Sequence, residues 1–320
     1  AAGPLSLRAG QRTAAISVSV RLDSAGAIAE RRIARSWVQP RYGLTYADGD
    51  ELIELAPPGD ETLADLSQLM QLRSRWRRQQ GALMFDRMEG RFRRSDGALS
   101  LQLVEPSPAR LMVSEAMLLM GAVVAEFGCQ HELALPFRSQ PPAELPSQAE
   151  LDQLPEGPAR DAAIKRCLSR GVQGTQPMAH FSLGLSAYVQ ATSPIRRYAD
   201  LASHRQIIAQ LENTTPLSEP EMGELIDDLD DPLRQSIQIS REDQRHWQQV
   251  WFSQYRDQRW DAEFLRFLRP QDGLALVHLA DLAMDVVGRV DQGNPNPGDR
   301  MTMTVKLADP DRGELQLQLT

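Results

Sequence analysis

The chain has 320 residues, enough for one large domain followed by a small one. Its two cysteines, Cys129 and Cys167, are too few for a disulfide framework and are typical of a cytoplasmic protein. We recognise neither a signal peptide nor an apolar run of membrane-spanning length, so no membrane partner is expected.

The charge balance is acidic, with a formal net charge of −8 and a pI of about 5.3. An acidic chain argues superficially against a nucleic-acid partner, although net charge is a weak guide when charges are clustered. Arginine supplies 33 of the 35 basic residues, and it gathers at residues 31–35, 73–78, 91–94 and 196–197. Arginine binds phosphate bidentately and stacks on bases, as RNA binding requires, whereas a codon bias toward arginine explains most of these clusters equally well.

The chain begins with a predicted β-hairpin. Residues 13–22 alternate with the period of a strand, residues 23–26 form a turn, and residues 27–38 return as a second strand. A second hairpin fits residues 90–104, with its turn at Ser95, Asp96 and Gly97. Helical patterns cover residues 60–80, 109–127 and 159–170, and the middle one is apolar throughout, as expected of a core helix.

The most informative stretch is TSPIRRY, residues 192–198. Ser193 and Pro194 precede a helix-compatible run, and many helices begin with Ser as N-cap and Pro in the first turn. We therefore predict a helix that begins at one of these two residues and ends near residue 212, with Arg196 and Arg197 in its first turn. Free backbone N–H groups beside two guanidinium groups would hold a phosphate. The plain alternative is that both arginines decorate a solvated helix start.

The wider stretch contains an ordered series of residues: His180-Phe181, Gly184-Leu185, Tyr188, the TSPIRRY run, Asp200 and His204-Arg205. This series resembles the signature of the ribonuclease II / RNB family of 3′-to-5′ exoribonucleases. The resemblance implies that Arg196 and Tyr46 are catalytic, with Arg196 clamping the scissile phosphate and Tyr46 lying close to it. It also implies a set of RNA-binding residues, in which the first stacks on bases: Phe85, Arg197, Tyr198, Thr192, Ser193 and His180.

The chain departs from the family pattern at two places. The long apolar helix of the family usually carries a pair of acidic residues and an Asn, where this chain has Ser114-Glu115 and Gly121. Gln190-Ala191 stands where most relatives carry His or an aromatic pair.

The C-terminal part has a different pattern. Residues 220–251 read as a helix interrupted at Pro232, and the aspartates just before this proline are interpreted as a solvated face. Short strands separated by turn signals predict an OB-type barrel, and they cover residues 260–268, 273–279, 284–290, 300–307 and 313–319. Residues 298–319 also resemble the end of an S1 RNA-binding domain.

The predicted fold class is α+β. Residues 1–254 are expected to form the C-terminal part of an RNB catalytic domain, a mixed β-sheet with packed helices. Residues 255–320 are expected to form a small S1-like OB-fold barrel.

The resemblance also implies Mg²⁺, held by a cluster of aspartates upstream of the segment that matches residues 5–14. No D-x-D-D string occurs in residues 1–60, where Asp23 is the first acidic residue. We therefore expect the magnesium ligands in a longer parent protein and none in this chain.

By this resemblance the parent protein is a processive, hydrolytic 3′-to-5′ exoribonuclease that acts on single-stranded RNA and releases nucleoside 5′-monophosphates. It is expected to be a cytoplasmic monomer with no DNA partner, and this chain alone is expected to be inactive. Two alternatives remain: a catalytically inactive RNA-binding module, and a structural or partner-binding protein, which the acidic pI favours. The salt dependence of RNA affinity separates these two alternatives.

Overall fold

The computed structural model describes residues 3, 6–95 and 97–320, which form two compact units. The first unit lies within residues 1–84, 107–142 and 169–231, and the second within residues 85–106, 143–168 and 232–320. The chain therefore passes several times between the units. The predicted boundary after residue 254 coincides with the end of a helix, and its status as a domain boundary stays a prediction.

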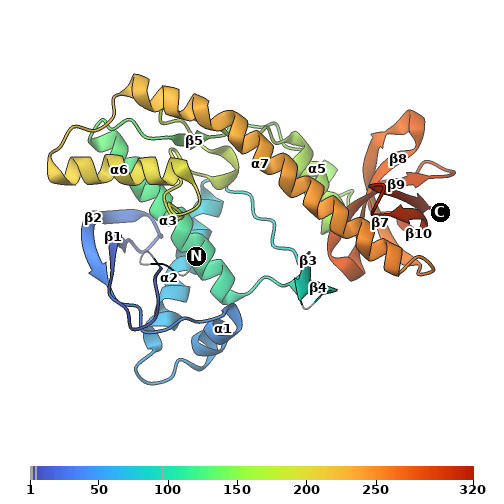
Figure 1. Ribbon diagram of the computed structural model, residues 1–320, viewed down its shortest axis with the longest axis horizontal. Helices are drawn as coiled ribbons and strands as arrows, with labels where there is room; N and C mark the ends of the chain where they lie inside the picture. Colours follow the sequence, from blue (N-terminus) through green and yellow to red (C-terminus); the bar gives the residue numbers. More distant parts are fainter. Residues whose placement is uncertain (1–2, 4–5, 96) are drawn as a thin grey trace. The chain divides into compact units, whose positions relative to one another are not determined.

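The first unit contains two β-ribbons and four helices, followed by the beginning of a fifth (Figure 1). Its elements are β1 (Thr13–Leu22), β2 (Ile28–Val38), α1 (Tyr46–Leu55), α2 (Glu61–Gln79), α3 (Pro108–Gln130), β5 (Phe137–Ser139), β6 (Val172–Gly174), the 3₁₀ turn η1 (Phe181–Leu183), α6 (Tyr198–Glu212) and the start of α7 (Glu219–Gln254).

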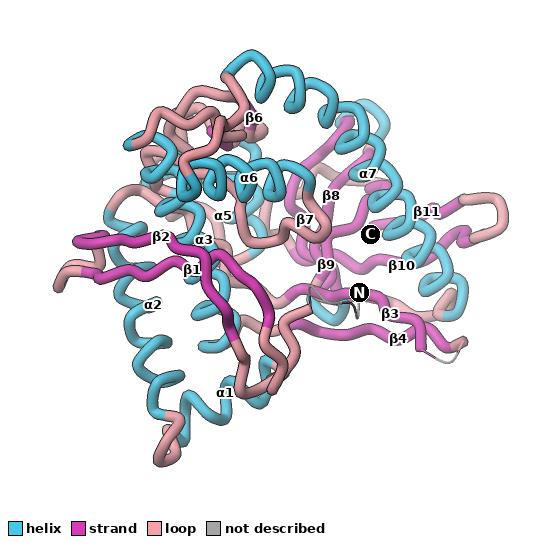
Figure 2. The backbone as a smooth tube through the Cα atoms, turned by 60° about the vertical axis from the view of Figure 1, so that its left-hand side comes forward, coloured by secondary structure: helices cyan, strands magenta, loops and turns pink. Residues whose placement is uncertain are grey.

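The predicted N-terminal hairpin is confirmed. β1 and β2 pair antiparallel, with Thr13 opposite Val38. Gly26 in the connecting turn has φ +94°, and a Cβ there would lie 2.7 Å from the Leu72 carbonyl oxygen of α2. The turn therefore needs glycine both for its conformation and for its close approach to the helix. Figure 2 shows the hairpin beside α2 and α3.

Helix α3 is the core of the first unit, as predicted. Val123, Val124 and Ala125 are fully buried, and they pack in a cluster that includes Ile33 of β2 and Met70 of α2. The sequence prediction that no segment is long and apolar enough to cross a membrane is wrong, because α3 meets both conditions. Half of that stretch is buried inside the protein, and a core helix passes the same test of length and composition.

Helix α1 was not predicted. Its N-cap Thr45 accepts a hydrogen bond from the Asp48 backbone N–H, and the Asp48 carboxylate accepts one from the Thr45 backbone N–H. This reciprocal pair is a capping box, a start signal that is visible in the sequence.

The predicted start of helix α6 is wrong, whereas its predicted end at residue 212 is confirmed. The helix begins at Tyr198 with Arg197 as its N-cap, so neither arginine of TSPIRRY lies in its first turn. Residues 194–196 form a separate turn, in which the Ser193 carbonyl accepts the backbone N–H groups of Arg196 and Arg197.

The second unit contains a hairpin, two short helices, most of α7 and a barrel. Its elements are β3 (Glu89–Ser95), β4 (Ala98–Val104), α4 (Gln148–Leu151), α5 (Pro158–Cys167), β7 (Trp260–Arg269), η2 (Pro270–Asp272), β8 (Leu274–Leu279), η3 (Ala280–Leu282), β9 (Met284–Val290), β10 (Arg300–Asp309) and β11 (Glu314–Leu319). The predicted hairpin at residues 90–104 is confirmed, although Asp96 of its turn lies outside the described residues.

Helix α7 is continuous through Pro232, so the predicted interruption is wrong. The proline lacks the N–H that would donate to the carbonyl of the preceding turn, yet the residues on both sides of it are helical. The two compact units meet in the sequence at this residue.

The predicted five-stranded barrel is confirmed. Its strands close in the order β10-β11-β9-β8-β7, with β11 and β9 parallel and the other pairs antiparallel. Trp260, Phe264 and Met303 fill its interior. The α+β class with a terminal OB-type barrel is therefore correct, and the remaining described strands form two-stranded antiparallel ladders.

Candidate functional site

The TSPIRRY turn is held in place by one buried carboxylate. Asp200, in the first turn of α6, is fully buried, and its Oδ2 accepts the backbone N–H of Ser193 at 2.8 Å. The same oxygen accepts the Arg197 Nε and Nη2 groups at 3.0 and 2.6 Å. Since hydrogen bonds to a charged group are the strong ones, this set fixes the turn against the helix.

The two arginines of the turn have different surroundings. The Arg197 guanidinium also donates to Thr192 Oγ1 at 3.2 Å, so most of its donors already have acceptors within the protein. The Arg196 side chain is exposed and has no hydrogen bond or ion pair to any described residue. Its neighbours Ile195 and Tyr198 are also exposed, at 65% and 48%. Arg196 therefore keeps its whole donor fork for a ligand.

The loop before the turn is tied to the body of the first unit. His204 of α6 bonds the Ala191 carbonyl oxygen at 2.7 Å through its Nε2. Arg138 of β5 donates to the Gln190 side chain at 3.0 Å. Gln190-Ala191, one of the two departures from the family pattern, thus has a structural role in this chain.

His180 lies edge-on to the ring of Tyr188, with 6.1 Å between ring centroids. Burial, assisted by the charge of Arg138, lowers the pKa of His180. Its Nδ1 is buried and has no partner among the described residues. Burial raises the pKa of Tyr188 above its usual value. The predicted RNA-binding His180 is thus a half-buried side chain that is not part of the hydrogen-bonded turn.

A buried ion pair lies beneath this loop, and the sequence interpretation missed it. Arg77 of α2 and Glu115 of α3 are both almost completely buried, and Arg77 Nε donates to Glu115 Oε2 at 2.9 Å. Arg77 Nη1 donates to the Leu183 carbonyl oxygen of η1 at 2.8 Å. The acidic residue that this chain keeps on α3 is therefore neutralised inside the protein.

A helical spacing could have revealed Arg77. Met70, Arg73 and Arg77 follow one another at intervals of three and four residues, so both arginines lie on the buried face of α2. Arg73 donates to the Gly26 carbonyl oxygen at 2.9 Å and lies 3.9 Å from the centre of the Trp76 ring. Burial and the neighbouring Arg77 lower the pKa of Arg73 to about 10.

Packing explains why this chain has Gly121 where the family usually has Asn. A Cβ at this position would lie 2.2 Å from the Tyr188 ring and 2.6 Å from the Val189 carbonyl oxygen. The Val189 backbone N–H also donates to the Gly121 carbonyl at 3.3 Å. The loop that precedes TSPIRRY therefore packs directly on the α3 backbone, where no side chain fits.

The predicted catalytic Tyr46 is the first residue of α1 and is 42% exposed. The Arg110 guanidinium of α3 lies 4.1 Å from the centre of its ring. No hydrogen bond, ion pair or ring contact among the described residues joins Tyr46 to the TSPIRRY turn. The structure thus brings together Thr192, Ser193 and Arg197, and it leaves the role of Tyr46 a prediction.

Phe85, the predicted stacking residue, lies in the second unit. The Lys165 ammonium of α5 lies 4.6 Å from the centre of its ring. Burial and the nearby Arg87 lower the pKa of Lys165. One face of the half-buried Phe85 ring is therefore covered by a cation.

The described residues do not fit a catalytic metal. They contain no group of three or more His, Cys, Asp or Glu side chains that could hold a metal ion. We therefore derive no chemical step through Mg²⁺ from the residues of this chain.

Comparison with known proteins identifies the family. Residues 2–213 match the RNB domain. An uncharacterized ribonuclease of Synechocystis is 39% identical over 320 residues, which cover 99% of this chain and 48% of that protein. The chain thus spans less than half the length of this relative and of the chloroplastic/mitochondrial ribonuclease II of Arabidopsis thaliana, which it also matches.

Two solved structures show the same fold. Mycoplasma genitalium RNase R, in complex with ribose-methylated single-stranded RNA, has a TM-score of 0.83 at 17% identity, over 98% of this chain and 59% of that one. Yeast Ssd1, described as a pseudonuclease, has a TM-score of 0.61 at 15% identity, over 89% of this chain and 40% of that one. With the match over residues 2–213, this chain belongs to the RNB domain family, whose named members here are ribonucleases II and R.

Proposed function

We propose that this chain is the part of an RNA-degrading exoribonuclease that grips the scissile phosphate. The observation that carries the proposal is the contrast within TSPIRRY: Arg197 is bound by the buried Asp200, while the Arg196 side chain is exposed and has no partner in the part of the chain that the structure describes. Leaving a guanidinium unpaired beside a rigid turn keeps five donors ready for an external anion. A phosphodiester offers two oxygens that match the guanidinium fork.

The roles of the other residues follow from this core. Arg196 would contact and polarise the phosphate, and Tyr46 would orient the 3′ end. Thr192, Ser193 and Arg197 would act as the frame that holds the turn, because their donors and acceptors are engaged with one another or with Asp200. Tyr198, exposed at the first position of α6, would contact RNA directly.

His180 in the first unit and Phe85 in the second would each add an RNA contact of its own. Burial and the charge of Arg138 lower the pKa of His180 and so favour its neutral form, in which it would contact RNA as a hydrogen-bonding group and not as a cation. Phe85 would stack on a base through the ring face that Lys165 does not cover.

The whole protein is proposed to be a hydrolytic, processive enzyme that degrades single-stranded RNA from the 3′ end to nucleoside 5′-monophosphates. We propose residues 1–254 as part of its catalytic domain and residues 255–320 as an S1-like RNA-binding domain. Mg²⁺ would be held by residues outside this chain. The whole protein is further proposed to be a cytoplasmic monomer that acts on RNA and not on DNA.

The test is degradation of a 5′-labelled single-stranded RNA in Mg²⁺. The full-length protein should release nucleoside monophosphates and shorten the strand from its 3′ end, and excess unlabelled RNA added during the reaction should not stop strands already engaged. The 320-residue chain alone should bind the strand and leave it intact. Release of mononucleotides by the chain alone would contradict the assignment of the metal ligands to another part of the protein.

A catalytically inactive RNA-binding module is the second candidate. It is favoured by one finding, that a pseudonuclease shares this fold. In that case the full-length protein binds the labelled strand with the same affinity in the presence and absence of Mg²⁺ and never shortens it.

A further inference from the structure

Lys165, in the last turn of α5, is one of only two lysines in a chain with 33 arginines. It is exposed, and its ammonium group lies 4.6 Å from the centre of the Phe85 ring. No hydrogen bond or ion pair joins the Lys165 side chain to any residue that the structure describes. Its amine is therefore left without an acidic partner in that part of the chain.

Three carboxylates lie close enough to act electrostatically on Lys165, and each is engaged by another residue. Asp161 precedes Lys165 by four residues on α5, a spacing that favours an ion pair, yet it accepts the Arg87 Nε at 2.8 Å instead. The other two carboxylates are each bonded to a basic residue 2.8 or 2.9 Å away: Glu89 to Arg91, and Asp285 to His278. All these residues belong to the second unit.

These surroundings favour the neutral form of the amine. Burial by the neighbouring groups, together with the charge of Arg87, lowers the pKa of Lys165, and the three engaged carboxylates oppose this shift without cancelling it. A lysine becomes nucleophilic when it is desolvated or lies close to another cation, because more of it then carries the free lone pair. Lys165 meets both conditions and is still exposed to a reagent in solution.

We propose that Lys165 is an acylation site, whose amine takes an acyl group from an acyl phosphate. The Nζ lone pair attacks the carbonyl carbon and forms a C–N bond. The C–O bond to phosphate breaks, phosphate leaves with the electron pair, and the displaced amine proton passes to the solvent. Such a donor is small enough to reach an exposed amine without a binding site of its own.

Acylation replaces the ammonium group by an uncharged amide. The cation that covers one face of the Phe85 ring is thereby lost. Because Phe85 is the residue proposed to stack on a base, the modification changes the surface beside that contact. The reaction itself requires no RNA, so it goes beyond the proposed function and is tested separately from it.

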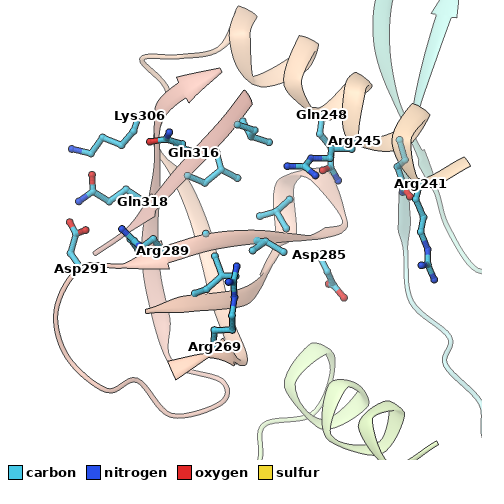
Figure 3. Close-up of a pocket in the computed structure, with 17 residues that line it drawn as sticks. Arg241, Arg245, Gln248, Arg269, Asp285, Arg289, Asp291, Lys306, Gln316 and Gln318 are labelled. Atoms are coloured by element: carbon cyan, nitrogen blue, oxygen red, sulfur yellow. The ribbon is translucent and has the colours of Figure 1, made fainter. Parts of the chain in front are cut away.

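The experiment treats the chain with acetyl phosphate at about pH 8, below the usual lysine pKa of about 10.4, and follows acetylation of both lysines by mass spectrometry of their peptides. The internal control is Lys306 of β10, which is also exposed and without an ion pair among the described residues. It lines a cleft between α7 and the barrel (Figure 3), together with four arginines: Arg241, Arg245, Arg269 and Arg289. Both lysines thus have cations in their surroundings, and Lys165 differs by its position over an aromatic ring.

In the wild-type chain Lys165 should be acetylated several-fold faster than Lys306. Two substitutions that break the same ion pair then separate the effect of charge from a general loosening of the fold. Arg87→Gln removes a cation and frees Asp161 to pair with Lys165, so acetylation of Lys165 should slow several-fold. Asp161→Asn removes a carboxylate that raises the pKa of Lys165, so acetylation should be at least as fast as in wild type. Lys306 should react at the same rate in all three proteins.

Equal rates for Lys165 and Lys306 in the wild-type chain would overturn the proposal, and this comparison needs no substitution. Slower acetylation of Lys165 in the Asp161→Asn variant would also overturn it, because the reactivity would then follow the ion pair and not the charges around the amine. An unchanged rate in Arg87→Gln would do the same. None of these outcomes bears on RNA cleavage, so the proposed function fails or stands by its own test.

Discussion

At the scale of single residues, the two adjacent arginines of TSPIRRY differ in the hydrogen bonds that their side chains make. Arg197 donates hydrogen bonds from Nε and Nη2 to Asp200 and from Nη2 to Thr192, and a fully buried carboxylate that lost such a partner would strongly destabilise the fold. Arg196 has an equal charge, and its side chain has no acceptor among the residues that the structure describes. Sequence alone makes the pair equivalent, whereas the hydrogen bonds give Arg197 a structural role and leave the Arg196 side chain available for a ligand.

Replacing Arg197 by Lys should therefore destabilise the fold. The substitution keeps the charge and loses the fork that bonds Asp200, which costs about 2 kcal/mol for a hydrogen-bonded charged group. Urea unfolding of the 320-residue chain measures this loss. Arg196→Lys is the matched control, because its side chain has no internal bond to lose. Unchanged stability in both variants would contradict the structural role of Arg197.

His180 predicts a pH dependence of stability. Its pKa is lowered by burial, so in the window below its unfolded value of about 6.5 the unfolded state binds more protons than the folded state. The free energy of unfolding should fall as pH decreases through this window. His180→Gln should reduce that fall, while substitution of the exposed His246 by Gln should not. Identical pH profiles for wild type and His180→Gln would exclude this assignment.

Phe85 is predicted to stack on a base near the RNA end. Phe85→Ala in the full-length protein should weaken RNA binding by roughly 1–3 kcal/mol, the value of one base stacked on an aromatic ring, and leave the cleavage step of bound RNA nearly unchanged. Binding constants and single-turnover rates separate these effects. If the variant instead unfolds, Phe85 is a packing residue and the stacking assignment is lost.

At the scale of elements, the loop before TSPIRRY is positioned by helix α3. Gly121 allows Tyr188 and Val189 to lie against the helix backbone, and Arg77, which is paired with Glu115, donates to the Leu183 carbonyl oxygen at the end of η1. Both contacts depend on residues far away in the sequence. Helices α2 and α3 thus contact and position the segment that carries the family signature.

Restoring the family's Asn at Gly121 should therefore damage this chain. Any Cβ there meets the Tyr188 ring at 2.2 Å, and such overpacking of a close contact costs about 3 kcal/mol. Gly223→Ala in α7 is the control, because no heavy atom lies within 4 Å of its Cβ position, and it should stabilise by up to about 1 kcal/mol. Thermal unfolding of both variants checks the opposite signs. A stable Gly121→Asn variant would show that the loop can move away from α3.

The sequence predicts elements whose signals are local. The β1–β2 hairpin, α3 and the five barrel strands follow from periodicity and turn residues, and all are present. The start of α6 is mispredicted because the buried carboxylate of Asp200, seven residues after Ser193, captures the Ser193 N–H and folds residues 194–196 as a turn. The Thr45–Asp48 capping box of α1 is also a local signal in the sequence, although helix α1 is missing from the predicted elements.

The site was predicted only in part, for the same reason. The order of residues from His180 to Arg205 indicates the family, but it does not say which arginine is free. That distinction requires the side-chain bonds of Asp200. The Arg77–Glu115 pair joins residues that are 38 positions apart, so only the spacing of Arg73 and Arg77 on the buried face of α2 hints at it.

At the scale of the whole molecule, the family match and the compact units divide the chain differently. The RNB domain covers residues 2–213, while the barrel and most of α7 lie beyond it in the second unit. The overall charge of −8 conceals a local excess of cations between α7 and the barrel.

The most direct test of the central claim compares Arg196→Lys with Arg197→Lys in the full-length protein, by single-turnover cleavage of labelled RNA and by RNA binding. Lysine at residue 196 keeps the charge and loses the fork, so cleavage should slow by about two to three orders of magnitude, as when one preorganised donor is removed, with RNA affinity nearly unchanged. Arg197→Lys should slow cleavage by less than about tenfold, because Arg197 supports the turn and does not itself contact the phosphate. This rate is measured at temperatures where the variant remains folded. Equal, small effects of the two substitutions would mean that Arg196 does not contact the scissile phosphate.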